Sequence, residues 1–170
     1  SSDFRAGERL FSLLMQAAGR AGRDADISAA AEMWIQTFHP QHPLFEALKR
    51  HDYPAFAAQQ LIERAQAGLP PFSFQALVRA EARTQEVAQA FLAAASERVG
   101  ASAEQANVTL YPPVPMSMQR VANVERAQML VESESRAALQ RFLSEWQGVL
   151  RSTRDKSILR WAIDVDPLAI

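Results

Sequence analysis

The order of hydrophobic periods after residue 72 limits the possible folds of this chain more than any other feature. Apolar residues alternate with polar ones along 72–82 and then recur at helical spacing along 84–99. Alternation with period two is typical of a half-buried strand, and spacings of three and four residues are typical of an amphipathic helix. The expected strands are 72–82, 108–110, 124–131 and 159–165; the expected helices are 84–99 and one that begins at a Ser133 or Ser135 cap and runs to about residue 150.

This order of strand, helix, strand, strand, helix, strand matches the split βαβ, or ferredoxin-like, arrangement. It predicts an α+β domain in which two helices cover one side of a four-stranded antiparallel sheet and leave the other side open. In that arrangement the first and third strands are central neighbours. The stripes expected to face the sheet are Val87, Ala90, Phe91 and Ala94 in the first helix, and Leu139, Phe142, Leu143, Trp146 and Leu150 in the second.

Residues 1–71 carry a different pattern, which predicts helices separated by short connections. The first helix is expected to stop at Gly19, and 32–38 is expected to be a short strand because it contains Trp34, Ile35 and Phe38. The stripe of the first helix is Leu10, Leu13, Leu14 and Ala17; the next helices begin at Pro43 and near Pro54, and the last of them ends at Gly68 before Pro70-Pro71. We therefore expect three parts: 1–50, a linker helix within 51–71, and a domain at 72–170.

Composition excludes several classes of protein. The 170 residues carry 18 basic and 19 acidic side chains and no cysteine. A disulfide scaffold, a thiolate zinc site and a cysteine nucleophile are therefore excluded from this chain. Because no apolar run approaches the roughly 20 residues of a membrane span, we expect a cytoplasmic protein without membrane association. The near-zero net charge argues against a histone-like binder but permits a local basic face.

The sharpest chemical signal is the segment Gln16-Ala17-Ala18-Gly19-Arg20-Ala21-Gly22-Arg23. Its two arginines are three residues apart, and each follows a small residue, which suits two guanidinium groups directed at one phosphate chain. The segment resembles the Gln-x-x-Gly-Arg-x-Gly-Arg motif of superfamily two helicases, in which the arginines reach the γ-phosphate of a nucleotide between two RecA-like lobes. The alternative is a helix C-terminus that uses glycine for capping and arginine to complement the helix dipole.

Further blocks of sequence resemble the PriA family of primosomal, replication-restart helicases. They occur in the family's order and span nearly the whole chain. The blocks are 35–43, 52–56, 63–64 with 68–72, 76–82 and 161–168. Two segments depart from the family's pattern: 27–33 is alanine-rich where the family more often has a glycine turn, and 122–125 is less basic than usual.

The resemblance implies a C-terminal fragment of an ATP-dependent DNA helicase that recognises stalled replication forks and initiates primosome assembly. Residues 1–50 would be the end of the second helicase lobe. Arg20 and Arg23 would be arginine fingers, and Gln16 and Gly19 would join them at ATP, in the full-length protein only. The parent would bind ATP with magnesium, and zinc in a cysteine-rich region. This chain has no phosphate-binding loop and no cysteine, so we expect it to bind none of these and to be inactive alone.

Three arginines are expected on the open side of the predicted sheet. Arg79 lies on the first strand, Arg126 on the third and Arg160 on the fourth, and such a face can follow the phosphate backbone of branched or forked DNA. Glu81 and Asp164 have the same parity along their strands, so a face satisfied by its own salt bridges is the alternative. That face has no pair of aromatic residues on which bases would stack.

The second helix of this domain presents a basic and an amide side chain one turn apart. Arg136 and Gln140 share a face and are able to grip one carboxylate together. In the PriA family the corresponding positions contribute to binding the acidic C-terminal tail of the single-stranded DNA-binding protein, so the resemblance implies that partner, together with other primosome proteins. The alternative is that Arg136 pairs with Glu132 or faces solvent.

Two histidine-containing and acidic groupings were weighed as metal sites, and no metal is predicted at either. His39 and His42 are spaced like metal ligands and lie near His51 and Asp52 in the sequence. A proline directly follows both His39 and His42, however, which favours a role in turns and helix caps. Asp164 and Asp166 are expected to share a strand face as solvated acids.

If the helicase interpretation fails, the alternative function is a non-enzymatic ferredoxin-like module that docks protein or nucleic acid.

Overall fold

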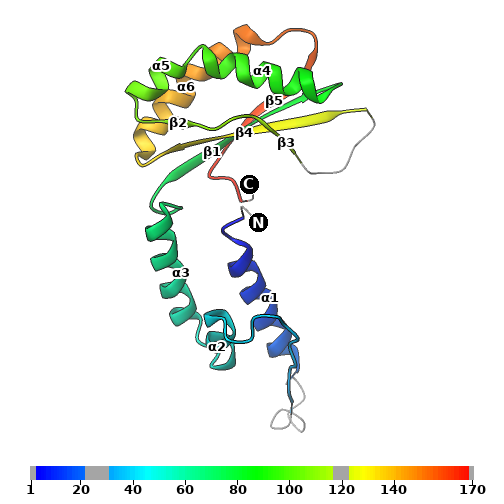
Figure 1. Cartoon of the computed structure of the whole chain (residues 1–170), viewed down its shortest axis with the longest axis vertical. Coiled ribbons are helices and arrows are strands. Elements are labelled where there is room, and N and C mark those ends of the chain that lie inside the picture. Colours follow the sequence, from blue (N-terminus) through cyan, green and yellow to red (C-terminus); the bar gives the residue numbers. More distant parts are fainter. Residues whose placement is uncertain (1–2, 22–30, 117–122, 169–170) are drawn as a thin grey trace. The chain divides into compact units, whose positions relative to one another are not determined.

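The computed structural model describes residues 3–21, 31–116 and 123–168, and the chain divides into two compact units, Ser1–Ala67 and Gly68–Ile170. The described residues of the first unit form helices α1 (Ala6–Ala21), α2 (Pro43–Lys49) and α3 (Tyr53–Ala67), shown in Figure 1. No helix in the described ranges is long and apolar enough to cross a membrane.

Aromatic packing holds the first unit together. Phe11 of α1 stacks on Phe56 of α3 with ring centroids 4.2 Å apart, and both side chains are buried. Leu44, Ala47 and Leu48 of α2 complete this core. The segment expected to be a linker helix thus supplies α3, which packs within the first unit.

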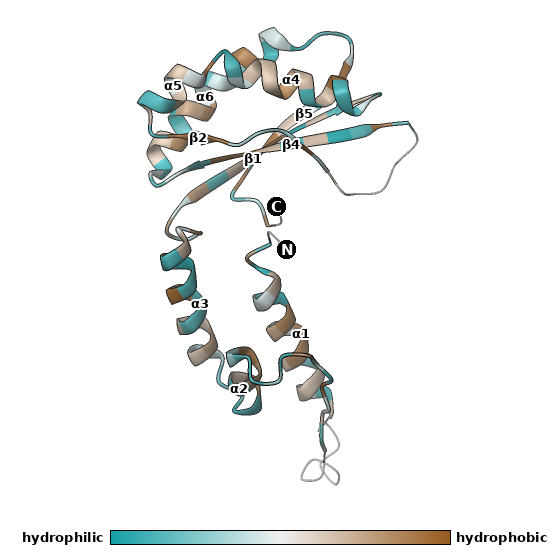
Figure 2. Ribbon diagram, in the orientation of Figure 1, coloured by the Kyte–Doolittle hydropathy of each residue, from teal (hydrophilic) through white to brown (hydrophobic). Residues whose placement is uncertain are grey.

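The predicted core face of α1 is correct only for Leu14, which packs partly buried against the core of the first unit. Leu10 and Leu13 are 43% and 64% exposed, whereas Phe11 is 1% exposed. Figure 2 shows apolar residues along most of this helix, so the hydropathy pattern permits more than one inward face. The stacking of Phe11 on Phe56 selects the face, because an aromatic ring buries more apolar surface than a leucine.

The short strand expected at 32–38 is absent, and that prediction is wrong. Trp34 and Phe38 are 88% and 100% exposed. A strand requires a hydrogen-bonded neighbour, and the described residues of the first unit provide no second strand. The first helix also continues beyond its expected end at Gly19, to Ala21.

The second unit is an α+β structure with an antiparallel sheet. Its strands are β1 (Phe74–Ala82), β2 (Thr109–Leu110), β3 (Val114–Pro115), β4 (Glu125–Ser133) and β5 (Ile158–Val165), and its helices are α4 (Gln85–Glu97), α5 (Gly100–Gln105) and α6 (Arg136–Thr153). The strand order is β2-β4-β1-β5, and β3 also pairs with β4. The predicted first and third strands are therefore central neighbours. Figure 1 shows α4 and α6 on one side of the sheet.

The sheet has five strands instead of the expected four. The prolines at 112, 113 and 115 predict an end to pairing after the second strand, but the chain returns to β4 at Val114, and Pro115 itself lies opposite Ala127. Helix α5 was not predicted either. Both elements are very short, so neither leaves a periodic signal in the sequence.

The helices pack on the sheet through one large core, and one of the two predicted stripes is correct. All five residues predicted on α6 are buried. On α4 the buried residues are Ala88, Phe91, Leu92 and Ala95. The predicted stripe is therefore correct for Phe91 and for Val87, which packs partly buried against the core, and wrong for Ala90 and Ala94, which are exposed. An alanine-rich helix contains two overlapping stripes of similar hydropathy, and packing of Leu92 selects between them.

Candidate DNA- and partner-binding surfaces

The sheet face that points away from α4 and α6 carries the three arginines predicted to bind DNA. In the strand registers, Arg79 of β1 lies opposite Gln128 of β4, and Glu81 of β1 lies opposite both Arg126 of β4 and Arg160 of β5. Residues that are directly paired across strands project from the same face. The three central strands therefore bring these arginines to one surface, which we call the open face.

Two arginines of the open face are paired with carboxylates of the same face. Arg79 Nη1 lies 3.2 Å from Asp164 Oδ2, and Arg126 Nε lies 3.0 Å from Glu81 Oε1. All four side chains are partly exposed, and such pairs contribute only about 0.2–1 kcal/mol each. The predicted alternative, a face satisfied by its own salt bridges, is therefore present for Arg79 and Arg126. These ion pairs are weak enough for a phosphate group to displace the carboxylates.

Arg160 differs from the other two arginines of the open face. Its side chain is exposed and makes no hydrogen bond or ion pair with any described residue. It lines a shallow pocket of about 270 Å³ together with Arg79, Arg126, Met116 and Trp161. Glu81 lies between two arginines and pairs with Arg126, which leaves the guanidinium of Arg160 available to an anion.

A polar network that the sequence analysis missed surrounds Glu132 at one end of the open face. Gln75 Nε2 donates to Glu132 Oε2 at 2.8 Å, and Tyr111 Oη donates to Glu132 Oε1 at 3.4 Å. Burial, followed by the negative charge of Glu132, raises the pKa of Tyr111 above its usual value. Gln75 and Ser73 are buried polar residues whose partner is visible only once the register of β1 against β4 is known.

Arg136 at the start of α6 is held by two groups, neither of which was predicted. Its Nη2 lies 3.1 Å from Asp166 Oδ2, and its guanidinium carbon lies 4.9 Å from the centroid of the Phe74 ring. The predicted alternative partner, Glu132, is not the residue that it pairs with. The Arg136 side chain is still 56% exposed, and Gln140, one turn further along α6, is exposed. The two side chains therefore remain accessible to a carboxylate.

The helicase-like motif lies at the C-terminal end of α1. Gln16, Gly19 and Arg20 are exposed and share one side of the helix, and Arg20 makes no contact with another described residue that satisfies its charge. A Cβ atom added at Gly19 would meet nothing within 4 Å, so this chain's own packing does not require glycine there. Arg23 lies outside the described residues.

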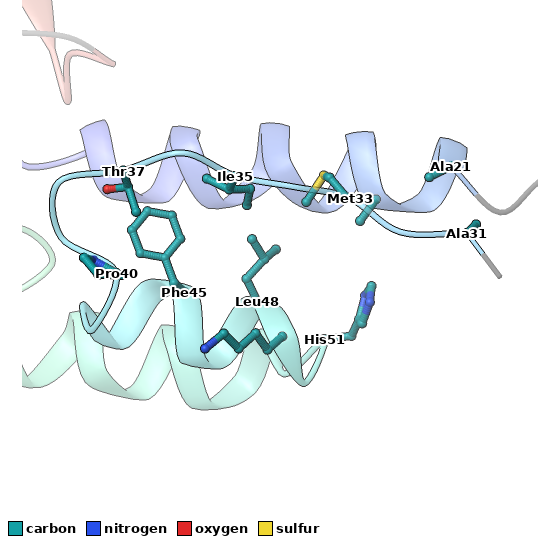
Figure 3. Close-up of a pocket in the computed structure, with 11 residues that line it drawn as sticks. Ala21, Ala31, Met33, Ile35, Thr37, Pro40, Phe45, Leu48 and His51 are labelled. Atoms are coloured by element: carbon teal, nitrogen blue, oxygen red, sulfur yellow. The ribbon is translucent and has the colours of Figure 1, made fainter. Parts of the chain in front are cut away.

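A pocket of about 480 Å³ lies beside this end of α1. Figure 3 shows Phe45 and Leu48 of α2 facing Met33 and Ile35 across it, with His51 at one side. Most of the lining residues are apolar, and Ala18 and Ala21 of the motif contribute to the lining. Gln16, Gly19 and Arg20 are not among the residues that line this pocket.

Of the residues weighed as metal ligands, His42, Asp52, Asp164 and Asp166 have structural partners through their side chains. His42 Nδ1 accepts the Leu44 N–H at 3.1 Å and caps α2, as the turn-and-cap interpretation predicted. No group of three potential ligands occurs in the described part of the chain. Asp166 lies beyond the end of β5 with φ 53°, so it does not continue the strand face of Asp164 as expected, and the two carboxylates hold different arginines.

Comparisons with known proteins identify relatives along the whole chain. Residues 65–168 match the family model described as the primosomal protein N C-terminal domain. The replication restart protein PriA of Haemophilus influenzae is 40% identical over 167 residues, which cover 98% of this chain and 22% of that protein. The PriA proteins of Synechocystis sp. and Rickettsia conorii are 32% and 31% identical, covering 99% and 98% of this chain and 19% and 24% of theirs. The chain thus spans about a fifth to a quarter of the relatives' length.

Proposed function

We propose that this chain, which belongs to the PriA family of replication restart proteins, is the DNA- and partner-binding C-terminal part of an ATP-dependent helicase that recognises stalled forks and initiates primosome assembly. The observation that carries the proposal is the open face, where three arginines gather and Arg160 has no acidic partner among the described residues. The strand order supports a ferredoxin-like arrangement for this domain. A cytoplasmic location remains a prediction.

The open face would bind branched DNA through phosphates and without reading bases. Phosphate contacts are independent of sequence and weaken with salt, and each contact adds about 0.9 to the slope of log affinity against log salt. Anisotropy of a labelled fork titrated with the 170-residue chain measures this slope. We expect Arg160→Gln to weaken binding and to lower the magnitude of the slope by about 0.9, which corresponds to the loss of one phosphate contact. The matched control is Arg151→Gln, which removes an exposed arginine from the end of α6.

A docking module without DNA affinity is the second candidate function. It is favoured by the ion pairs that occupy Arg79 and Arg126. If the chain fails to bind forked DNA at low salt, or if Arg160→Gln and Arg151→Gln have equal effects, the DNA-binding role of the open face is wrong and the docking function takes its place.

Arg136 and Gln140 would bind the C-terminal carboxylate of the acidic tail of a single-stranded DNA-binding protein. Arg136 supplies the cation, and the Phe74 ring beneath it supplies an apolar surface. Titration of a tail peptide into labelled chain, followed by NMR at Arg136 and Gln140, tests the site. Arg136→Glu should abolish the peptide's effect, and Arg141→Glu, on an exposed position of the same helix, is the control. If the tail peptide binds Arg136→Glu and Arg141→Glu with equal affinity, Arg136 and Gln140 do not form its binding site.

Residues 1–50 would complete the second RecA-like lobe of the full-length protein. The exposure of Leu13, Trp34 and Phe38 supports this assignment, because large apolar side chains usually lie against a partner surface. Arg20 and Arg23 would then act as arginine fingers, with Gln16 and Gly19 beside them at ATP. In the full-length protein Arg23→Ala should lower DNA-stimulated ATP hydrolysis roughly a thousandfold or more. Arg9→Ala, at the other end of α1, should leave turnover unchanged; unchanged turnover in Arg23→Ala would refute the assignment.

A further inference from the structure

The open face of the second unit has a basic half and an apolar half. The basic half is formed by the three arginines described above. Further along β4, apolar side chains take their place; these side chains, which we call the apolar half, are Leu77, Tyr111, Val114 and Leu130. Leu77 is buried, whereas Tyr111 and Val114 are 41% and 48% exposed. The face therefore offers a cationic and an apolar surface to one ligand.

Tyr111 directly follows β2 and projects from the open face. Its N–H donates to Leu130 O at 2.9 Å, next to the register pair of Leu110 and Val131. Leu110 packs against the core under the helices, so the residue after it points to the opposite face of the sheet. The Tyr111 Oη accordingly reaches Glu132, a residue of the open face. The register thus adds an aromatic ring to that face.

The ring of Tyr111 is accessible and is held in place. No other aromatic ring or cation contacts it in the described part of the chain. Its hydroxyl donates to Glu132, and Pro112, the next residue, restricts the Tyr111 backbone to extended conformations. A side chain that is ordered before binding loses little conformational entropy when it meets a ligand. Tyr111 is therefore suited to be a stacking surface.

We propose that Tyr111 stacks on an unpaired base of single-stranded DNA whose phosphates lie on the arginines of the open face. The inference rests on the proposed DNA-binding function and adds the form of DNA that this face takes, a single strand of the kind exposed at a fork. Bases within a duplex are stacked on one another, so only an unpaired base offers its π-face to a protein ring. Every base has such a face, and the contact is therefore independent of sequence.

The charges of the open face set the direction of the strand. Glu132 beside the Tyr111 hydroxyl repels a phosphate, whereas Arg160 has no acidic partner among the described residues. A base is thus favoured at the tyrosine and a phosphate at Arg160. The registers separate these two residues by three strand spacings and four residues, about 20 Å between Cα atoms. That span holds about six stacked nucleotides, or fewer if the strand is extended.

Two oligonucleotides test the stacking on the unchanged 170-residue chain. One is a dye-labelled oligothymidylate of about eight nucleotides; the other has the same phosphates, with every base replaced by an abasic sugar. Because the two strands carry the same charge, their phosphate contacts are matched and only the stacking differs. Fluorescence anisotropy should show that the abasic strand binds at least about fivefold more weakly.

Variants assign this difference to Tyr111. Tyr111→Ala should weaken binding of the oligothymidylate at least about fivefold and leave binding of the abasic strand unchanged. Tyr111→Phe keeps the ring and should keep most of the affinity, and circular dichroism should be unchanged in both variants. The matched control is Tyr53→Ala, which removes the chain's other tyrosine, 54% exposed on α3 of the first unit.

Salt dependence separates the stacking contact from the phosphate contacts. Tyr111→Ala should leave the slope of log affinity against log salt unchanged, whereas Arg160→Gln should lower its magnitude by about 0.7 for a single strand. Equal binding of the two oligonucleotides, or equal effects of Tyr111→Ala and Tyr53→Ala, would overturn the stacking proposal. If Arg160→Gln still weakened fork binding, the DNA-binding function would stand and the apolar half would be left to a duplex or an acidic peptide. Failure of both strands and the fork to bind at low salt would refute both proposals.

Discussion

Replacement of Trp146 by phenylalanine tests how the two long helices of the second unit are joined. Trp146 of α6 is fully buried, packs against Phe142 and donates its indole N–H to Ala95 O at 2.9 Å. Ala95 lies in the last turn of α4, where carbonyl groups lack partners within the helix. The indole therefore caps α4 from a residue 51 positions away.

The expected loss of stability has two parts. Removal of the indole donor leaves a buried carbonyl without this partner, which costs about 1–3 kcal/mol. The smaller ring leaves a cavity of about 40 Å³, which adds about 1 kcal/mol. Trp146→Phe should therefore lower the free energy of unfolding by about 2–4 kcal/mol, a large share of the roughly 5–15 kcal/mol typical of a domain.

Urea unfolding followed by far-ultraviolet circular dichroism measures this loss. The matched control is Phe142→Leu, which removes a buried ring that packs on Trp146 but has no polar partner, and which should cost about 1 kcal/mol. A loss in Trp146→Phe no larger than that in Phe142→Leu would show that the hydrogen bond to α4 adds nothing, and the reasoning would be refuted.

Three further predictions follow from other contacts. Glu81→Gln releases Arg126 and should tighten binding to forked DNA by roughly 1.4–5-fold, in line with the strength of an exposed ion pair; unchanged affinity would exclude Arg126 from the interface. Because the folded-state pKa of Tyr111 is raised, its contribution to stability is present below about pH 10 and is lost as the pH rises through the folded value. Glu132→Gln should lower that pKa only in part, since burial is the larger cause; absorbance at alkaline pH in a background without the other tyrosine measures it. Phe11→Ala should cost about 3–5 kcal/mol in the first unit alone, seen by hydrogen exchange, and equal loss of protection in both units would contradict this.

Several features of the candidate sites were accessible from sequence, and others were not. Parity along β1, β4 and β5 was enough to place Arg79, Arg126 and Arg160 on one face. It did not show that Glu81 pairs with Arg126 and leaves Arg160 free, because both arginines are direct neighbours of the same glutamate. The choice depends on side-chain conformations of residues that are distant in sequence.

The sequence alone determined the elements whose signals are local. The stripe of α6 and the alternation along β1 are visible within a few neighbouring residues, so periodicity was sufficient. Capping chemistry limited the start of α6 to Ser133 or Ser135, and the structure shows Ser135 as the cap. Only the tertiary structure decided which side of α1 and α4 faces inward, that 32–38 has no strand to pair with, and that Arg136 pairs with Asp166. Each of these depends on a partner far along the chain, and hydropathy, which is a sum over single residues, contains no information about which distant surface a residue meets.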